Sequence, residues 1–333
     1  MPHDFRPTLK NLAAQAQIEP LQGKTIAVLG FGAQGSAHAL NLRDAGLEVL
    51  VAQRPGGHRH AAAQAAGFTP VTISNAAQRS DLLIFALPDD AAPAIYRSEI
   101  EPHLRPGQTL GFMHGFVIHY QAIQPRPDID VVMIAPKAQG QGVRDAFVAG
   151  TGVLALVAIA QNATGQALQT ALAWAAGIGA NRTGILQTTF KDETETDLFG
   201  EQSVLCGGLT ALIQAGFDAL VNAGYPPELA YSECCHEVKL IVDLIHAGGI
   251  GHMRDRISTT ARFGDLTRGP RVIGDSVRQA MQSVLTEVRN GQFAREFLSR
   301  TPATSNNPQT ANLAELEAVG RYVRELMQGR TPE

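Results

Sequence analysis

Short apolar runs recur through the first half of the chain, with mixed or polar segments between them. The runs occupy positions 24–29, 47–52, 81–87, 108–113, 130–135 and 153–160. Each has the length of a strand, and a nearly unbroken apolar sequence is typical of strands buried on both faces of a parallel sheet. The pattern therefore predicts an α/β domain in this half of the chain.

The strand pattern then stops, and long apolar stretches follow at 197–221, 227–247 and 274–289. These stretches predict helices, and their apolar residues are too continuous for helices that expose one face to water. We therefore expect the helices to be buried or to form a subunit interface. The prediction is a first domain over residues 1–188 and an all-helical second domain over residues 189–333.

Two segments are expected to divide this helical half. Glycines at positions 248, 249 and 251 predict a break, because glycine weakens a helix interior. Residues 300–310 are rich in Pro, Asn, Ser and Thr, which predicts a flexible connector before a last helix.

Composition and charge argue against several classes of protein. The 333 residues carry a formal net charge of −4, which gives no basic surface for nucleic acid. No apolar run approaches the ~20 residues of a membrane span, and the N-terminus lacks a secretory-signal pattern. Three cysteines, two of them adjacent, provide neither a disulfide framework nor zinc-site spacing. We therefore expect a cytoplasmic enzyme without nucleic-acid or membrane partners.

A glycine-rich segment follows the first apolar run directly. Gly30 allows a tight turn, Gly32 lets the backbone approach a diphosphate, and Gly35 allows close packing of helix on strand. A strand, such a turn, a helix and a second strand within about 30 residues predict a Rossmann-type dinucleotide site rather than a turn without a ligand. The residues assigned to coenzyme binding are Gly30, Phe31, Gly32, Ala33, Gln34 and Gly35.

The end of the second strand bears on the choice between NAD and NADP. NAD sites usually place an acid there to bind the ribose hydroxyls. Residues 53–60 contain no acid, but they contain Arg54 and Arg59. Because a guanidinium fork suits a 2′-phosphate, the sequence favours NADPH, with Arg54 as the leading contact and Arg59 as a second candidate. The alternative is that both are solvated loop arginines.

Two pairs of acids point to a metal site. Asp197 and Glu201 are four residues apart, as are Glu233 and Glu237, and both pairs fall in predicted helices among apolar neighbours. Residues at i and i+4 share a helix face, where like charges repel. Hard divalent ions such as Mg²⁺ take oxygen ligands of this kind. The alternative is a solvated acidic helix face.

That alternative is the interpretation we adopt for three neighbouring acids, Asp192, Glu193 and Glu195, because acids favour a helix N-terminus. His114 and Lys137, in contrast, follow predicted strands directly. Ligands bind beyond the carboxyl ends of such strands, so both are candidate catalytic residues. A structural hydrogen-bonding role is the alternative for each.

Several segments of the chain resemble the ketol-acid reductoisomerases. They are FGAQGSAHALNLRDAG, LPDD, HGFVIHY, APK, TTFKDETETDLFGEQSVLCGG, AGYPPELAYSECCHEVKLIVDL, GGI and ISTTARFGD. The resemblance covers nearly the whole chain, whose length fits the short-form (class I) members. It implies a Rossmann domain followed by an all-helical, knotted domain that dimerises, together with NADPH and two Mg²⁺ ions. It also implies alkyl migration in a 2-aceto-2-hydroxy acid, followed by reduction to a 2,3-dihydroxy acid for valine and isoleucine biosynthesis.

The resemblance also implies residue roles. Asp197 would bridge both metals and Glu201 would complete one metal site. Glu233 and Glu237 would be ligands on the second metal's side, contributed by the partner subunit to a shared active site. Ser258 would hydrogen-bond the substrate carboxylate. The remaining assignments are His114, Lys137 and Glu237 as catalytic residues and Gly140 as a coenzyme contact.

The chain also departs from the family's usual motifs near the proposed site. Valine replaces an asparagine at 117, glycine replaces a phosphate-binding serine at 57, and further substitutions are Ala138, Gln139, Gln141, Thr259, Arg262 and Phe263. Two hypotheses therefore stay open for the substrate: 2-acetolactate, or a different 2-keto acid used by a paralogue. A non-catalytic binding protein is a third hypothesis, but the intact acid pairs argue against it.

Overall fold

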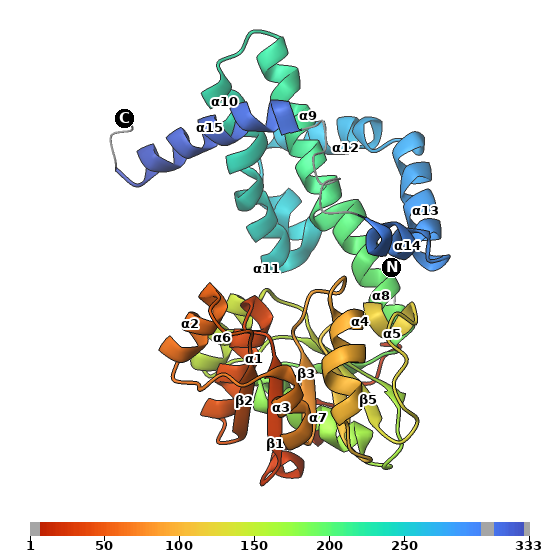
Figure 1. The fold of residues 1–333 in the computed structure, drawn as a ribbon. Coiled ribbons are helices and arrows are strands. Elements are labelled where there is room, and N and C mark those ends of the chain that lie inside the picture. The colour runs from red at the N-terminus through yellow and green to blue at the C-terminus, as the bar shows by residue number, and fades with distance from the viewer. Residues whose placement is uncertain (1–6, 301–309, 330–333) are drawn as a thin grey trace. The chain divides into compact units, whose positions relative to one another are not determined.

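The computed structural model describes residues 7–300 and 310–329. The chain divides into two compact units, Met1–Thr196 and Asp197–Glu333. The first is an α/β unit and the second is helical in its described residues (Figure 1). This is the predicted fold class.

The first unit is built on one sheet of seven strands in the order β2-β1-β3-β4-β5-β6-β7. All neighbouring strands pair in parallel except β5 and β6, which are antiparallel. The six predicted strands are confirmed, whereas the last strand was missed because three residues are too few to show a pattern. The strands are β1 Thr25–Leu29, β2 Glu48–Ala52, β3 Leu82–Phe85, β4 Thr109–Phe112, β5 Asp130–Pro136, β6 Ala155–Gln161 and β7 Ile185–Gln187.

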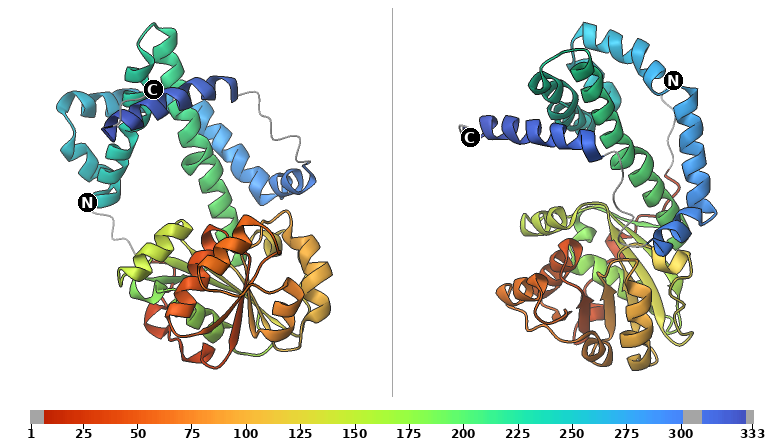
Figure 2. Two further views of the ribbon diagram at one scale, coloured as in Figure 1. Left: turned by 60° about the vertical axis from the view of Figure 1, so that its left-hand side comes forward. Right: turned by 45° about the horizontal axis from the view of Figure 1, so that its top comes forward.

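Helices cover both faces of this sheet (Figure 2). They bury strands that are apolar on both sides; β3 and β4, for example, consist only of buried residues. Full burial of each large apolar side chain contributes about 1.5–3 kcal/mol. The helices are α1 Ala33–Asp44, α2 His58–Ala65, α3 Ile73–Arg79, α4 Ala92–Ile95, α5 Phe116–His119, α6 Gly140–Val148 and α7 Ala167–Gly177.

A buried pair of rings, His38 of α1 and Trp174 of α7, joins these two helices. Trp174 is fully buried, and its indole Nε1–H donates to Nδ1 of His38 at 3.0 Å. The indole fits because position 111 of β4 is glycine: a β-carbon there would lie 2.8 Å from Trp174 Cζ3. Burial lowers the pKa of His38 to about 3, so this imidazole is neutral at ordinary pH.

The second unit contains long helices, as predicted, but two of them are interrupted by π-helical turns. The π turns are η6, Glu201–Leu205, and η7, Ser232–His236. The helices are α8 Phe190–Gly200, which begins in the first unit, α9 Gly207–Asn222, α10 Pro227–Tyr231, α11 Val238–Arg256, α12 Thr259–Val272, α13 Asp275–Arg289, α14 Gln292–Ser299 and α15 Thr310–Met327.

The predicted break at the glycines is present: Gly249 has φ 84° and ψ 176°, which is not helical, and it kinks α11. The predicted connector over 300–310 falls largely on residues 301–309, which lie outside the described part of the chain, and α15 follows it.

The described helices of the second unit leave much apolar surface exposed. Leu205 is 65% exposed and Phe263 is 62% exposed, while a small core forms around Phe217, Ala230 and Tyr231. The helical stretch 190–222 is also long and apolar enough, by length and composition alone, to cross a membrane, and only 6% of its apolar window is buried. These helices are therefore not buried within the described part of the chain, and the subunit interface stays a prediction.

Candidate active site

The glycine-rich turn lies between β1 and α1 and has a backbone that other residues would disrupt. Gly30 has φ +109°, and a β-carbon on it would lie 2.5 Å from the carbonyl oxygen of Ala86. A β-carbon on Gly35 would lie 2.3 Å from the Gly30 carbonyl oxygen. Gly32 is the N-cap of α1, so the amide groups at the start of this helix can point at an anion.

A cleft of about 280 Å³ opens beside this turn. Its lining includes Gly32 to Gly35, Arg59, His114 and Val117. The cleft lies at the carboxyl ends of β1, β3 and β4, where ligands bind in open α/β sheets. The remaining lining residues are Phe85, Ala86, Leu87, Pro88, Asp89, Ala92, Phe112 and Met113.

Residues at the end of β2 support the turn. Gln53, at the position where NAD sites usually place an acid, accepts a hydrogen bond from the Phe31 amide at 3.0 Å. Arg54 follows and is exposed, and it is absent from the lining of the cleft, whereas Arg59 lines it. The structure thus separates the two arginines that the sequence placed together.

The loop after β5 packs against the same turn. Gln34 Nε2 donates to the carbonyl of Ala138 at 2.8 Å. A β-carbon on Gly140 would lie 2.1 Å from the Ala33 carbonyl oxygen, so only glycine lets α6 approach α1 this closely. The geometry gives Gly140 a packing role beside the turn, and direct contact with a coenzyme stays a prediction.

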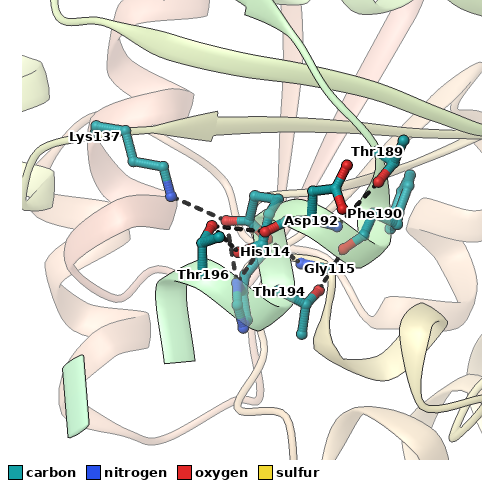
Figure 3. A network of polar contacts seen from close by, with 9 residues as sticks. His114, Gly115, Lys137, Thr189, Phe190, Asp192, Thr194 and Thr196 are labelled. Atoms are coloured by element: carbon teal, nitrogen blue, oxygen red, sulfur yellow. Dashed lines mark hydrogen bonds and ion pairs between the residues drawn. The ribbon is translucent and has the colours of Figure 1, made fainter. Parts of the chain in front are cut away.

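A buried carboxylate, Glu193, contacts two of the three predicted catalytic residues, His114 and Lys137. Figure 3 labels these two residues and Gly115. The Glu193 side chain has no exposed surface. Lys137 Nζ lies 3.1 Å from its Oε1, His114 Nδ1 lies 3.0 Å from its Oε2, and the Gly115 amide donates to Oε2 at 3.0 Å. Glycine is required at 115, because a β-carbon would lie 2.3 Å from Thr194 Oγ1.

These partners fix the charge of the carboxylate. Burial alone raises the pKa of Glu193, but the hydrogen bond and charge of His114, the charge of Lys137 and the Gly115 amide together hold it below its ordinary value. Glu193 is therefore ionised at neutral pH. His114 Nδ1 donates to this carboxylate, because an ionised carboxylate can only accept hydrogen bonds.

The interpretation of Glu193 and Glu195 as solvated helix acids is wrong. Glu193 is buried as described, and the Glu195 side chain is 12% exposed with Oε1 3.6 Å from His119 Nε2. The error has a physical reason, because the first turns of α8 lie over the turn between β4 and α5, which local sequence does not show. A signal was present: Glu193, Asp197 and Glu201 follow at intervals of four and therefore share a helix face.

Helix α8 also carries the first predicted metal ligand. Asp197 follows Glu193 by one turn of this continuous helix, and ligand atoms of His114, Glu193 and Asp197 lie within 4.8 Å of one another. Carboxylate oxygens suit Mg²⁺, so the donor set at Asp197 fits the predicted ion. In the described part of the chain, no such group includes Glu201, Glu233 or Glu237.

One acid of each predicted pair lies in a π turn: Glu201 begins η6, and Glu233 lies in η7. The Cys206 amide donates to the Glu201 carbonyl at 2.9 Å, and the Glu237 amide donates to the Ser232 carbonyl at 3.1 Å, each five residues back. Single π turns inside α-helices occur often at functional sites. Glu201, Glu233 and Glu237 have exposed side chains. The sequence pattern, which was read as regular α-helix, gave no sign of these turns.

Ser258 is the N-cap of α12, and its Oγ accepts a hydrogen bond from the Ala261 amide at 3.1 Å. Its neighbour Thr259 begins the helix. The structure therefore shows a capping role, and contact with a substrate carboxylate stays a prediction.

Comparison with known proteins gives matches over nearly the whole chain. A family model described as acetohydroxy acid isomeroreductase, NADPH-binding domain, matches residues 20–184. A second, described as ketol-acid reductoisomerase, C-terminal domain, matches residues 190–329.

Solved structures give the same result. An NADH-preferring ketol-acid reductoisomerase from an uncultured archaeon is 42% identical, with a TM-score of 0.90 over 96% of this chain and 99% of that one. A semialdehyde dehydrogenase NAD-binding protein from Cupriavidus necator, solved with calcium and NAD, is 19% identical with a TM-score of 0.61. It covers 81% of this chain and 99% of its own, and at this identity the likeness concerns the fold alone.

Proposed function

The chain belongs to the ketol-acid reductoisomerases, a family of oxidoreductases, and from this premise we propose its substrate, coenzyme and metal. We propose that it converts 2-acetolactate, or 2-aceto-2-hydroxybutanoate, to the corresponding 2,3-dihydroxy acid. Alkyl migration comes first and reduction by a nicotinamide coenzyme follows. The reaction would serve valine and isoleucine biosynthesis, and we expect a cytoplasmic location.

One observation carries this proposal: His114 belongs to both halves of the site. Its side chain lines the cleft beside the glycine turn, and its Nδ1 lies 3.0 Å from Glu193, one helical turn before Asp197. A group that binds at this ring would therefore meet both the coenzyme cleft and the Asp197 carboxylate. Such proximity is what a reaction requires when rearrangement and hydride transfer act on one bound molecule.

The chain's own residues would position the reacting groups and protons. Glu193 holds the His114 ring through Nδ1–H, and this ring would exchange a proton with the substrate or with a water. Lys137, held at 3.1 Å from Glu193, adds a positive charge where an alkoxide would develop. Glu193 is a positioning residue in this scheme, because it acts through His114 and Lys137.

The acids suit two Mg²⁺ ions, which would be held by Asp197 and Glu201 of one subunit and by Glu233 and Glu237 of the partner subunit. Bound there, the ions would polarise the ketone and stabilise the alkoxide of the tertiary hydroxyl. The exposed apolar surface of the second unit supports this dimeric arrangement, since exposed apolar patches mark interaction sites. The same surface is our explanation for the apolar stretch 190–222.

NADPH is the coenzyme we propose. Residues 53–60 contain no acid for the ribose hydroxyls of NADH, and Arg54 stands exposed at the end of β2, where a 2′-phosphate would lie. The archaeal enzyme that is 42% identical prefers NADH, so the preference needs its own measurement.

The decisive experiment tests whether the purified protein converts 2-acetolactate in the presence of Mg²⁺ and NADPH. The reaction is monitored by the loss of NADPH absorbance. Activity should disappear when EDTA is added and return with excess Mg²⁺. A sample stripped of metal that retains full activity would refute the metal assignment. Absence of acetolactate turnover, with metal and NADPH shown to bind, would refute the substrate.

A paralogue acting on a different 2-keto acid is the second candidate, and Val117 favours it. This side chain is buried and lines the cleft beside His114, where the family usually has asparagine. Reduction of 3-hydroxy-3-methyl-2-oxobutanoate, the product of migration, separates the two. The paralogue would keep this reduction while converting 2-acetolactate poorly, because migration demands a tighter pose and a displaced group can cost about a hundredfold.

A further inference from the structure

Arg59 lies beside the glycine turn at which the coenzyme's diphosphate would bind. It is in the first turn of α2, which begins after the loop that follows β2. A β-carbon on Gly32 would be 3.3 Å from Arg59 Nη1 and 3.7 Å from its Cζ. The guanidinium therefore covers the glycine at the N-cap of α1, and it lines the cleft together with residues 32–35.

The two halves of this arrangement are complementary to one ligand group. The N-terminus of α1 presents backbone amides and a partial positive charge, and Gly32 lets a phosphate approach them closely. A guanidinium on the open side of the glycine adds a planar fork of donors that can take two phosphate oxygens. A diphosphate bound at the N-terminus of this helix would therefore meet the guanidinium of Arg59 as a neighbour.

Arg54 is placed differently. It directly follows Gln53 at the end of β2, is exposed, and does not contribute to the lining of the cleft. Gln53 itself is held by the Phe31 amide. The end of β2 is where the adenosine ribose is read, so Arg54 is the arginine beside a 2′-phosphate.

We propose that Arg59 clamps the diphosphate that NADH and NADPH share, and that recognition of the 2′-phosphate is left to Arg54. The proposal rests on the coenzyme part of the proposed function. Loss of Arg59 should therefore weaken both coenzymes by similar factors, and loss of Arg54 should weaken NADPH alone. Because Arg59 would hold the diphosphate of both coenzymes, NADH should also bind. It should bind more weakly than NADPH, because it has no 2′-phosphate for Arg54 and residues 53–60 provide no acid for its ribose diol.

Binding to the full chain, measured by calorimetry without substrate, tests this division. The probes are NADPH, NADH and ADP-ribose, which has the diphosphate but no 2′-phosphate and no nicotinamide. Arg59→Ala should raise the dissociation constants of all three by roughly ten- to a hundredfold, the usual effect of a lost charge-assisted hydrogen bond. The matched variant Arg54→Ala should raise that of NADPH by a similar factor and those of NADH and ADP-ribose by less than about threefold.

Arg59→Lys controls for charge and fold. It keeps the cation without the planar fork, so it should bind all three probes with intermediate affinity, and its thermal unfolding should match the wild type. The proposal is overturned if Arg59→Ala weakens NADPH at least tenfold more than NADH, or if it changes none of the three. If the wild-type chain bound no probe, the coenzyme assignment itself would fail; if binding followed the pattern but acetolactate were not converted, only the substrate would.

Discussion

The two units of the chain differ in how they treat their apolar residues. In the first unit, Ile26, Leu83 and Trp174 have no exposed surface, and strands that are apolar on both faces are covered by helices. In the second unit, Leu205, Phe263 and many other large apolar residues are more than half exposed. The first unit buries its large apolar side chains within a single chain, whereas the described part of the second unit leaves many of them exposed.

The two units also differ in the part of the proposed reaction that their residues would serve. The coenzyme cleft belongs to the first unit, and every residue that lines it comes from that unit. The proposed metal ligands belong to the second unit, and three of them are exposed. We therefore expect coenzyme binding to withstand changes that destroy activity, and three experiments follow from this comparison.

The largest effect is expected for the charge at position 197. Asp197→Asn keeps the size of the side chain but removes the anion that the proposed metals need. Activity should fall by at least about a thousandfold, since loss of a catalytic metal removes several kcal/mol of transition-state stabilisation. The dissociation constant of NADPH, measured by calorimetry, should change by less than about threefold. A parallel loss of coenzyme binding would contradict the separation of the two units.

The next effect concerns the exposed helices. Leu240 in α11 is 52% exposed, and Leu240→Glu would place a charge on the proposed subunit interface. Sedimentation should show dissociation toward monomer, with activity at low protein concentration reduced by about tenfold or more, because a buried unpaired charge in an interface costs several kcal/mol. Val148→Glu is the matched control, since Val148 is 67% exposed on the first unit. Equal behaviour of the two variants would argue against an interface at α11.

The smallest effect is expected in the first unit, where the buried imidazole of His38 makes stability depend on pH. The pKa of His38 is about 3 in the folded chain and 6.5 ordinarily, because burial disfavours the charged form. Between pH 6.5 and about 3, the unfolded chain therefore binds a proton at His38 that the folded chain does not bind. The free energy of unfolding is unaffected by this group above pH 6.5 and falls as the pH is lowered toward 3. His38→Gln, which keeps an acceptor for Trp174, should make the unfolding free energy less dependent on pH by about 1.4 kcal/mol per unit.

Urea unfolding at several pH values between 6 and 4 would measure this difference. Carboxylates titrate in the same range, so only the difference between the two proteins is informative. Parallel curves for the variant and the wild type would show that His38 accepts its proton without unfolding.

Local sequence was sufficient for much of the fold. Gly30, Gly32 and Gly35 revealed the dinucleotide turn because their spacing directly after an apolar strand is itself a local pattern. Six strands were visible as apolar runs, and Gly249 marked a helix break. The antiparallel pairing of β6 with β5 was not visible, because strand direction depends on the path between strands rather than on their composition.

The site was predicted less completely, and for the same reason. His114 and Lys137 could be placed at strand ends, but Glu193, which joins them, resembled an ordinary first-turn acid. Its burial comes from the packing of α8 over the β4–α5 turn, a contact between segments 79 residues apart in sequence for Glu193 and His114. In sequence, Arg59 and Arg54 were both candidates for the same 2′-phosphate. The structure distinguishes them, because the path of the loop places Arg59 over Gly32.

The π turns give the second unit an unusual tolerance to one kind of mutation. A one-residue deletion within η6 or η7 would not break the helix, because the remaining residues can close ordinary i→i+4 hydrogen bonds. Such a deletion would instead rotate all side chains that follow by about 100°, the angle per residue of an α-helix with 3.6 residues per turn. A deletion between Glu233 and Glu237 would turn Glu237 away from Glu233, and one in η6 after Glu201 would turn the residues that follow away from Asp197 and Glu201. Deletion of one codon in η6 or in η7 would thus give a folded protein whose proposed metal ligands are misoriented.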